Sequence, residues 1–487
     1  MFNSPKNKRP EPQETIYWHD YETSGPVANM DRPYQFAGIR TDLDLNEIQE
    51  PNLLYCKPAE DMLPNPHACV LTGITPQKAQ KEGLCEADFA DKILAELSQP
   101  FTCGAGYNSL KFDDEVSRHL FYRNFRPVYD REWQNHNSRF DLLGVLRLTY
   151  LLRPNALKWF FHEKTPSFKL EDLSIANDCQ VGVAHEALSD VRCTIALAKK
   201  VKENANDLYE QLFNLRLKDN LIKHVKECME HKIPMLHASS VYSNENACVG
   251  LVTPLFFHPT RPQILIAIDL SRDIDELLNL DEESLFERFS RPLKENEERL
   301  PIQMIALNRV PALLSGKWLK GVDLNRCNFD LTKASVRQGT MIKNQDFMER
   351  FSRVLLRISQ IQENTKMMED PDLSLYEGFP TPEQTHLISE VRQASPEKLS
   401  KIIFDDVKYD ALLFRYRARN FFESLNDIDQ KTWKMFCKKR LSASLESRLN
   451  WEQFEEALLI EEHAGAPLEI IQALKDWMIE LKQKCNS

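Results

Sequence analysis

The pattern of apolar and polar positions divides the chain into stretches of different character. Four short runs rich in β-branched and aromatic residues predict strands, at residues 15–23, 36–40, 53–56 and 102–107. The first three are separated by polar stretches, which favours an antiparallel opening sheet. Helical spacing of apolar residues predicts helices at residues 89–97, 113–125 and 185 to about 201. From residue 138 we expect helix, proline-containing loop and helix. Residues 1–203 are therefore predicted to form one mixed α/β domain.

The rest of the chain changes from β-rich to helical. Residues 247–255 and 263–270 have the β-branched content of strands. The acidic stretch 273–298 carries leucines that predict helix packed on one side and solvated on the other. From residue 346 onward the pattern is helical. A length of 487 residues exceeds what one core usually organises, so we expect three domains, at residues 1–203, 204–360 and 361–487.

Composition limits the class of protein. No apolar run approaches the roughly 18 to 20 residues that cross a bilayer, and we expect a cytoplasmic protein without a membrane partner. The 11 cysteines lack the close pair spacing of zinc or dithiol sites, which predicts free thiols. The net charge of −11 does not exclude a nucleic-acid partner, because a ligand responds to the local field rather than to the sum of charges.

Asp20 and Glu22 are the most informative pair of residues for chemistry. They stand two positions apart near the end of a predicted strand, so both side chains point to the same face. Two neighbouring carboxylates need a cation, and Mg²⁺ prefers oxygen ligands. Taken alone, the pair favours a solvated strand end over a metal site.

Two further segments carry acidic residues next to predicted helices. Asp113 follows Asn108 and Phe112 at the start of one helix, where negative charge is favourable even without a function. His185 precedes Asp190 in a strongly helical segment. A helix that starts after His185 would place the imidazole at its N-terminal edge and Asp190 one turn later, facing inward.

These three segments, in this order, resemble the DEDD superfamily of 3′→5′ exonucleases, in the subgroup with histidine in the last motif. The patterns D-x-E-T, N-x-x-x-F-D and H-x-A-x-x-D are met at every fixed position, by Asp20, Glu22, Thr23, Asn108, Phe112, Asp113, His185, Ala187 and Asp190. The resemblance implies a ribonuclease-H-like α/β fold and two divalent metal ions.

Further segments resemble the bacterial exonuclease I family. They are HDYET from His19, DRPYQFA from Asp31, YCKP from Tyr55, LTGITP from Leu71, GYN from Gly106, FYRNF from Phe121 and FRYRARNF from Phe414. This likeness spans almost the whole chain. It implies an exonuclease domain, a β-rich SH3-like barrel domain and an all-α C-terminal domain, acting together as a processive exonuclease that degrades single-stranded DNA to 5′-mononucleotides.

The resemblance also implies roles for the site residues. Asp20, Glu22 and Asp190 are expected to bind two Mg²⁺ ions, which Mn²⁺ could replace, and Asp113 is expected to complete the acidic site through water or an indirect contact. Glu22 is expected to contact the substrate as well. His185, with an ordinary pKa of about 6.5, would accept a proton from the attacking water.

Residues 116–170 have the composition of a single-strand binding surface. They contain ten Lys and Arg against four acids, with aromatic residues between them, as backbone binding and base stacking require. The family resemblance implies DNA contacts by Arg118, Tyr129, Trp133, Arg147 and Lys218. Lys169 stands where the family usually has Arg, and it keeps the charge but not the bidentate fork.

Alternatives and partners remain open at this level. A related enzyme that trims RNA ends would use the same metal chemistry, and a clamp that binds nucleic acid without cleaving it would keep the fold. The resemblance implies a monomer that acts in DNA repair and recombination and binds the acidic C-terminal tail of single-stranded-DNA-binding protein. Arg415, Arg417 and Arg419 could attract such a tail, but we favour a role for them in anchoring the helical domain.

Overall fold

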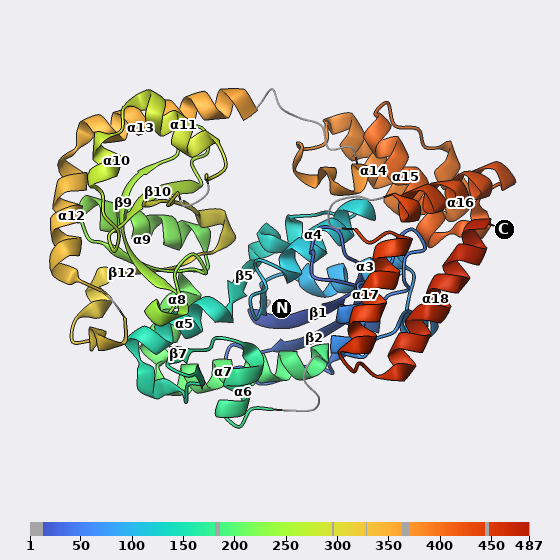
Figure 1. Cartoon of the computed structure of the whole chain (residues 1–487), viewed down its shortest axis with the longest axis horizontal. Helices are drawn as coiled ribbons and strands as arrows, with labels where there is room; N and C mark the ends of the chain where they lie inside the picture. The colour runs from blue at the N-terminus through green and yellow to red at the C-terminus, as the bar shows by residue number, and fades with distance from the viewer. Residues whose placement is uncertain are drawn as a thin grey trace, which may run out of the picture. The chain divides into compact units, whose positions relative to one another are not determined.

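A computed structural model describes residues 13–180, 186–294, 297–327, 329–362, 370–443 and 448–486 (Figure 1). The chain forms two compact units. The first comprises residues 1–139, 185–192 and 370–487, and the second comprises residues 140–184 and 193–369. The division runs through the predicted first domain, so the limits of the three predicted domains stay predictions.

A five-stranded sheet lies at the centre of the first predicted domain. Its strands, in the order β3-β2-β1-β4-β5, are β3 (Asn52–Tyr55), β2 (Pro33–Thr41), β1 (Thr15–Thr23), β4 (Thr102–Gly106) and β5 (Ser138–Asp141). β1 pairs antiparallel with β2, and β2 pairs antiparallel with β3, whereas β4 runs parallel to β1. The predicted antiparallel opening sheet and the glycine-containing fourth strand are confirmed.

Helices cover this sheet with apolar side chains. The helices that follow the opening strands are α1 (Pro66–Thr72), α2 (Pro76–Glu82), α3 (Glu86–Leu97) and α4 (Asp113–Arg123). Phe89 and Ile93 of α3 and Phe121 of α4 pack with Tyr21 and Phe36 of the sheet. The helices predicted at residues 89–97 and 113–125 are thus confirmed, and their apolar faces build the core beneath β1.

The helix predicted from residue 138 begins later than expected. Residues Ser138–Asp141 form the edge strand β5, and helix α5 (Leu142–Leu152) starts only after Asp141. The Asp141 carboxylate accepts a hydrogen bond from the backbone N–H of Leu143 at 2.9 Å and so caps the helix. The cap and the strand pairing together override the helical pattern at these four residues.

The C-terminal part of the first unit is helical, as predicted. Its elements include a 3₁₀ segment (Pro371–Tyr376) and the helices α14 (Pro382–Gln393), α15 (Val407–Asn420), α16 (Asp427–Ser442), α17 (Trp451–His463) and α18 (Leu468–Asn486). Phe454 of α17 and Trp477 of α18 share a buried cluster with Cys69 of α1 and Ala79 of α2. These helices therefore extend the core that the N-terminal segment begins.

A buried ionic cluster joins the same two parts of the first unit. Arg419 of α15 lies 2.7 Å from Asp61 and 2.6 Å from Asp372, and Arg415 lies 2.9 Å from Asp372. Burial alone would raise the pKa of Asp61, but Arg419 and Arg440 hold it below its usual range. The arginines of FRYRARNF thus anchor the helical segment, which confirms the structural role we favoured for that motif.

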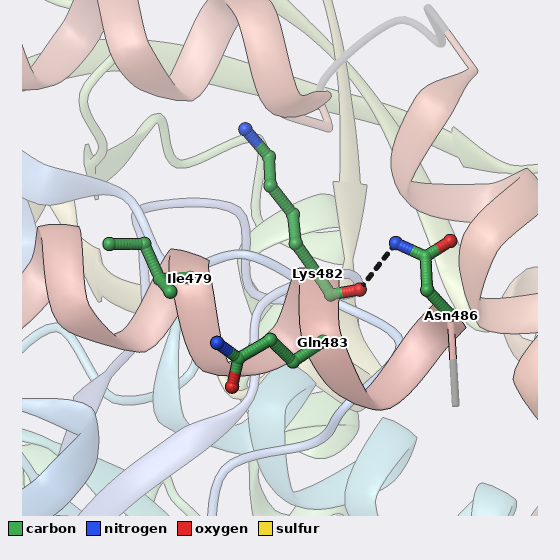
Figure 2. A pocket seen from close by; sticks show the side chains of 4 residues that line it. All are labelled: Ile479, Lys482, Gln483 and Asn486. Carbon is green, nitrogen blue, oxygen red and sulfur yellow. Dashed lines mark hydrogen bonds between the residues drawn. The ribbon is translucent and has the colours of Figure 1, made fainter.

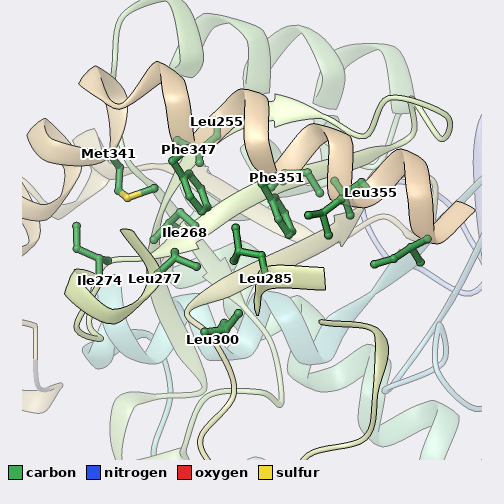
Figure 3. Packing of buried hydrophobic residues seen from close by; sticks show 13 residues of the cluster. Leu255, Ile268, Ile274, Leu277, Leu285, Leu300, Met341, Phe347, Phe351 and Leu355 are labelled. Atoms are coloured by element: carbon green, nitrogen blue, oxygen red, sulfur yellow. The ribbon is translucent and has the colours of Figure 1, made fainter. Parts of the chain in front are cut away.

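The second unit contains a five-stranded sheet of antiparallel strands. In the order β11-β10-β9-β8-β12 they are β11 (Ile302–Ala306), β10 (Ile264–Asp269), β9 (Val249–Phe257), β8 (Met235–Ala238) and β12 (Ala312–Ser315). Phe347 and Phe351 of α13 (Gln345–Gln362) pack against this sheet together with Met341 of α12 (Leu331–Lys343) (Figure 3). The β-rich middle part of the chain is therefore confirmed.

The acidic stretch of the second unit is helical and half-buried. It contains α10 (Asp275–Asn279) and α11 (Glu282–Ser290), whose Leu277 and Leu285 enter the core while the acidic residues stay at the surface. Other elements of this unit include α6 (Leu170–Ala176), α8 (Asn206–Asn214), α9 (Lys218–Glu230) and the small hairpin of β6 (Phe161–His162) and β7 (Thr165–Pro166). Helix α7 (Ala187–Asn204) runs across the boundary between the units.

Two predictions from composition can be compared with the structure. All eleven cysteines are free thiols, as expected. In the described part of the chain, no helix combines the length and the apolar character needed to cross a membrane.

Candidate functional site: an acidic cluster on the central sheet

Strand β1 presents two carboxylates on one face of the sheet. Asp20 and Glu22 are partly exposed, while Tyr21 between them points to the opposite face and is buried. This alternation is the one expected from the sequence. The carboxylates lie near the end of β1, next to a register shift between Glu22 and Thr23.

Asp190, in the first turn of α7, completes a group of three possible metal ligands. The ligand oxygens of Asp20, Glu22 and Asp190 all lie within 4.8 Å of one another. Two of these residues come from one strand and the third comes from a helix far along the chain. The fold therefore brings together the three residues predicted to bind metal.

Asp113 lies beside this group at the N-terminus of α4 and is almost fully buried. Its Oδ1 accepts a hydrogen bond from the backbone N–H of Tyr21 at 3.1 Å. One turn later in α4, the Ser117 hydroxyl lies 2.9 Å from the Tyr21 hydroxyl. These two contacts hold the start of α4 against β1. The Asp113 carboxylate is thereby fixed at the backbone of Tyr21, the residue between Asp20 and Glu22, where its charge acts on both of those carboxyl groups.

The four carboxyl groups perturb one another strongly. Burial, and then the charges of Asp113, Glu22 and Asp190, raise the pKa of Asp20 well above its ordinary value. Burial, followed by the charges of Asp190 and Asp113, raises the pKa of Glu22 to about 8. Close carboxylates resist ionising together unless a cation is present. The donor set contains only oxygen, which fits a hard divalent cation such as Mg²⁺.

His185 lies outside the described residues. Helix α7 begins at Ala187, two residues after it, as the prediction of a histidine just before the helix requires. Its role as proton acceptor stays a prediction.

Arg118, a predicted DNA contact, is buried in an ionic network behind α4. Its side chain lies 2.8 Å from Glu132 and 2.7 Å from Glu115, and the residue is only 6% exposed. Asp114, the neighbour of Asp113, pairs with two further arginines, Arg131 at 2.8 Å and Arg139 at 2.7 Å. Arg118 thus supports the fold around the site, and a direct contact with DNA stays a prediction.

Aromatic side chains near this network are more accessible. Trp133 is 64% exposed, and Tyr129 is half-buried with the Arg118 guanidinium 5.7 Å from its ring centre. The ring of Phe379, 86% exposed, lies 6.2 Å from the ring of Tyr129. Phe379 was not predicted as a site residue, because the residues around it in the sequence do not indicate that it lies beside Tyr129, 250 positions earlier in the chain.

The other predicted contacts lie in the second unit. Lys169 is exposed at the N-terminal cap of α6, and Lys218 is exposed as the first residue of α9. Arg147 is half-buried on α5. Their roles stay predictions.

A pocket on the surface of α18 is formed by a different set of residues. It is lined by Ile479, Lys482, Gln483 and Asn486 (Figure 2). The Asn486 side-chain amide donates to the Lys482 carbonyl at 2.8 Å, as neighbouring turns of a helix allow. The pocket contains no acidic residue and shares no residue with the acidic cluster.

Family models match most of the chain in three segments. A model described as exonuclease matches residues 17–198, a model of the exonuclease I SH3-like domain matches residues 216–357, and a model of the exonuclease I C-terminal domain matches residues 369–481. The predicted three-part architecture of exonuclease, SH3-like and helical C-terminal domains is confirmed. An exonuclease domain with this acidic cluster implies divalent metal ions.

Whole-chain comparisons agree with these models. Exodeoxyribonuclease I of Haemophilus influenzae is 36% identical, covering 96% of this chain and 98% of its own length. A crystal structure of Escherichia coli exonuclease I in complex with a dA16 oligonucleotide has a TM-score of 0.87 at 34% identity and covers 96% of this chain and 100% of its own. A structure of an ExoI/SSB-Ct complex has a TM-score of 0.86 at 33% identity, with coverage of 96% and 100%. This chain belongs to the exonuclease I family.

Proposed function

We propose that the protein is a processive 3′→5′ exonuclease that degrades single-stranded DNA to 5′-mononucleotides with two Mg²⁺ ions. The observation that carries the proposal is the convergence of Asp20, Glu22 and Asp190 within 4.8 Å, beside the buried Asp113. Such a concentration of negative charge is costly for folding alone. It is useful where divalent cations and a phosphate must be held together.

Each residue of the cluster has a separate task in this proposal. Asp20, Glu22 and Asp190 hold the metal ions, and Asp113 completes the acidic site through water or an indirect contact. When bound, the metal ions supply an acidified water and neutralise charge on the leaving oxygen. His185 accepts the proton of the attacking water, since an imidazole titrates near neutral pH. Glu22 also contacts the terminal nucleotide, and Lys169 neutralises a substrate phosphate.

Single-stranded DNA would be held outside the acidic cluster by cations and ring faces. Tyr129 and the exposed Trp133 offer surfaces for base stacking. Arg147 and Lys218 offer positive charge for the phosphate backbone. Arg118 stabilises the position of the Tyr129 ring, against which its guanidinium lies. The complex of a relative of the same architecture with a dA16 oligonucleotide supports single-stranded DNA as the ligand.

The proposal also includes a protein partner and a cellular setting. The ExoI/SSB-Ct complex supports binding of the acidic C-terminal tail of single-stranded-DNA-binding protein. The ion pairs of Arg415 and Arg419 leave that role to other basic residues. We propose that the protein acts as a cytoplasmic monomer in DNA repair and recombination.

The decisive experiment is digestion of 5′-labelled and 3′-labelled single-stranded DNA with Mg²⁺, beside duplex DNA and single-stranded RNA. An Asp20→Asn variant, which removes one ligand charge at nearly constant shape, serves as the matched control. Mg²⁺-dependent release of mononucleotides from the 3′ end of single-stranded DNA alone is the expected result. Preference for RNA would indicate the trimming enzyme, and tight binding without cleavage would indicate the clamp.

A further inference from the structure

Gln35 lies in a row of side chains that crosses three strands next to the acidic cluster. On β2 it stands directly opposite Glu22 of β1, and on β3 Tyr55 stands directly opposite Gln35. Directly opposed residues project from the same face of a sheet. Gln35 is 1% exposed. The buried amide side chain of Gln35 thus lies on the same face of the sheet as Glu22, a predicted metal ligand.

The amide of Gln35 has a partner at each end. Its Oε1 accepts a hydrogen bond from the backbone N–H of Ala187 at 3.2 Å. Its Nε2 donates to the Tyr55 hydroxyl at 2.7 Å. Because a backbone N–H can only donate, the oxygen of the amide must face Ala187 and the nitrogen must face Tyr55. Tyr55 therefore orients the amide for its contact with α7.

The contact with Ala187 falls at a sensitive place in α7. Ala187 is the first residue of the helix and is fully buried, and Asp190 lies in the same first turn. The first N–H groups of a helix have no acceptor within the helix, and a buried one needs a partner from elsewhere. Gln35 supplies that acceptor from the sheet. The hydrogen bond ties the turn that carries Asp190 to the strand beside Asp20 and Glu22.

We propose that Gln35 is a positioning residue for the metal site. It holds the first turn of α7 at the distance from β1 at which Asp190 meets Asp20 and Glu22, and it does so without touching the metal. The inference rests on the proposed function, since it requires that these carboxylates bind divalent ions. Groups that orient metal ligands typically change metal affinity by about 10- to 100-fold when they are removed.

The test is direct metal binding to a Gln35→Met variant, which keeps the length of the side chain and removes both hydrogen bonds. Mn²⁺ binding is followed by electron paramagnetic resonance and Mg²⁺ binding by calorimetry, without DNA. We expect affinity to fall by about 10-fold or more. A Gln77→Met variant is the matched control, because Gln77 of α2 also donates to a partly buried backbone carbonyl, that of Ala473, at 2.6 Å. It is expected to bind metal as the wild type does.

Each outcome decides the inference. A folded Gln35→Met protein with wild-type metal affinity would overturn it, as would an equal loss of affinity in Gln77→Met. If Gln35→Met does not fold, Tyr55→Phe decides, because it removes only the group that orients the amide: a few-fold loss of affinity supports the inference and an unchanged affinity overturns it. If the wild type itself binds metal no better than Asp20→Asn, the proposed function fails first, and this inference fails with it.

Discussion

Replacing Glu22 with Gln is expected to stabilise the metal-free protein while it abolishes the nuclease. The pKa of Glu22 lies near 8 in the folded chain because of burial and the charges of Asp190 and Asp113, against an ordinary value of 4.5. Between these two values the unfolded chain releases the Glu22 proton and the folded chain retains it. Stability therefore falls as the pH rises from about 4.5 to 8.

The size of the effect follows from the same two pKa values. At pH 7 the ordinary carboxyl is about 2.5 units above its pKa, and each unit corresponds to about 1.4 kcal/mol, so the ionisable Glu22 costs about 3 kcal/mol of unfolding free energy. Glutamine resembles the neutral carboxyl and carries no such cost. The gain from Glu22→Gln should vanish towards pH 4.5, where the glutamate itself is protonated in the folded chain.

The assay is urea or thermal unfolding in the presence of EDTA at both pH values. Glu203→Gln serves as control, because Glu203 is an exposed residue of α7, the helix that carries Asp190. We expect a higher midpoint for Glu22→Gln at neutral pH and no change for the control. Excess Mg²⁺ should raise the midpoint of the wild type far more than that of Glu22→Gln. A neutral-pH midpoint for Glu22→Gln at or below the wild type in EDTA would refute the argument from charge repulsion.

Three further substitutions test other parts of the molecule. His185→Ala should lower turnover by about 100-fold or more while single-strand binding, measured by fluorescence anisotropy, is kept; normal turnover would remove His185 from the mechanism. Lys169→Ala should raise KM in steady-state digestion, and an unchanged KM would remove Lys169 from the phosphate site. Arg419→Met should destabilise the fold by about 3 kcal/mol, because it removes the cation that pairs with two buried carboxylates, Asp61 and Asp372, and leaves Asp61 with Arg440 at 3.3 Å. An unshifted midpoint in denaturant unfolding would show that the Arg419 ion pairs are unimportant.

The secondary-structure elements could be predicted from the regular spacing of apolar side chains in strands and helices. A side-chain period of two in TIYWHDYET is enough to place Asp20 and Glu22 on one face, and the structure agrees. The same reasoning located β2, β3, β4, α3 and α4 to within a few residues. It failed at residue 138, where an N-cap at Asp141 and pairing at the sheet edge outweigh a helical pattern.

The local excess of positive charge predicted less well which cationic side chains are exposed at the surface. Arg118 belongs to a stretch with a clear excess of positive charge, yet its guanidinium is buried between Glu115 and Glu132. Counts along a sequence do not reveal which cations are neutralised by partners that approach from elsewhere. Phe379 shows the converse, an aromatic ring placed beside Tyr129 only by the packing of the C-terminal segment.

The sequence by itself determined the kinds of side chain available for chemistry, the local elements that carry them, and, through the motifs from Asp20 to Asp190, the family. Only the tertiary structure decided that three carboxylates meet within 4.8 Å and that Gln35 and Tyr55 hold the helix behind one of them. The reason is physical. Periodicity is a property of neighbouring residues, whereas the meeting of a strand with a distant helix depends on the packing and hydrogen bonding of the whole domain.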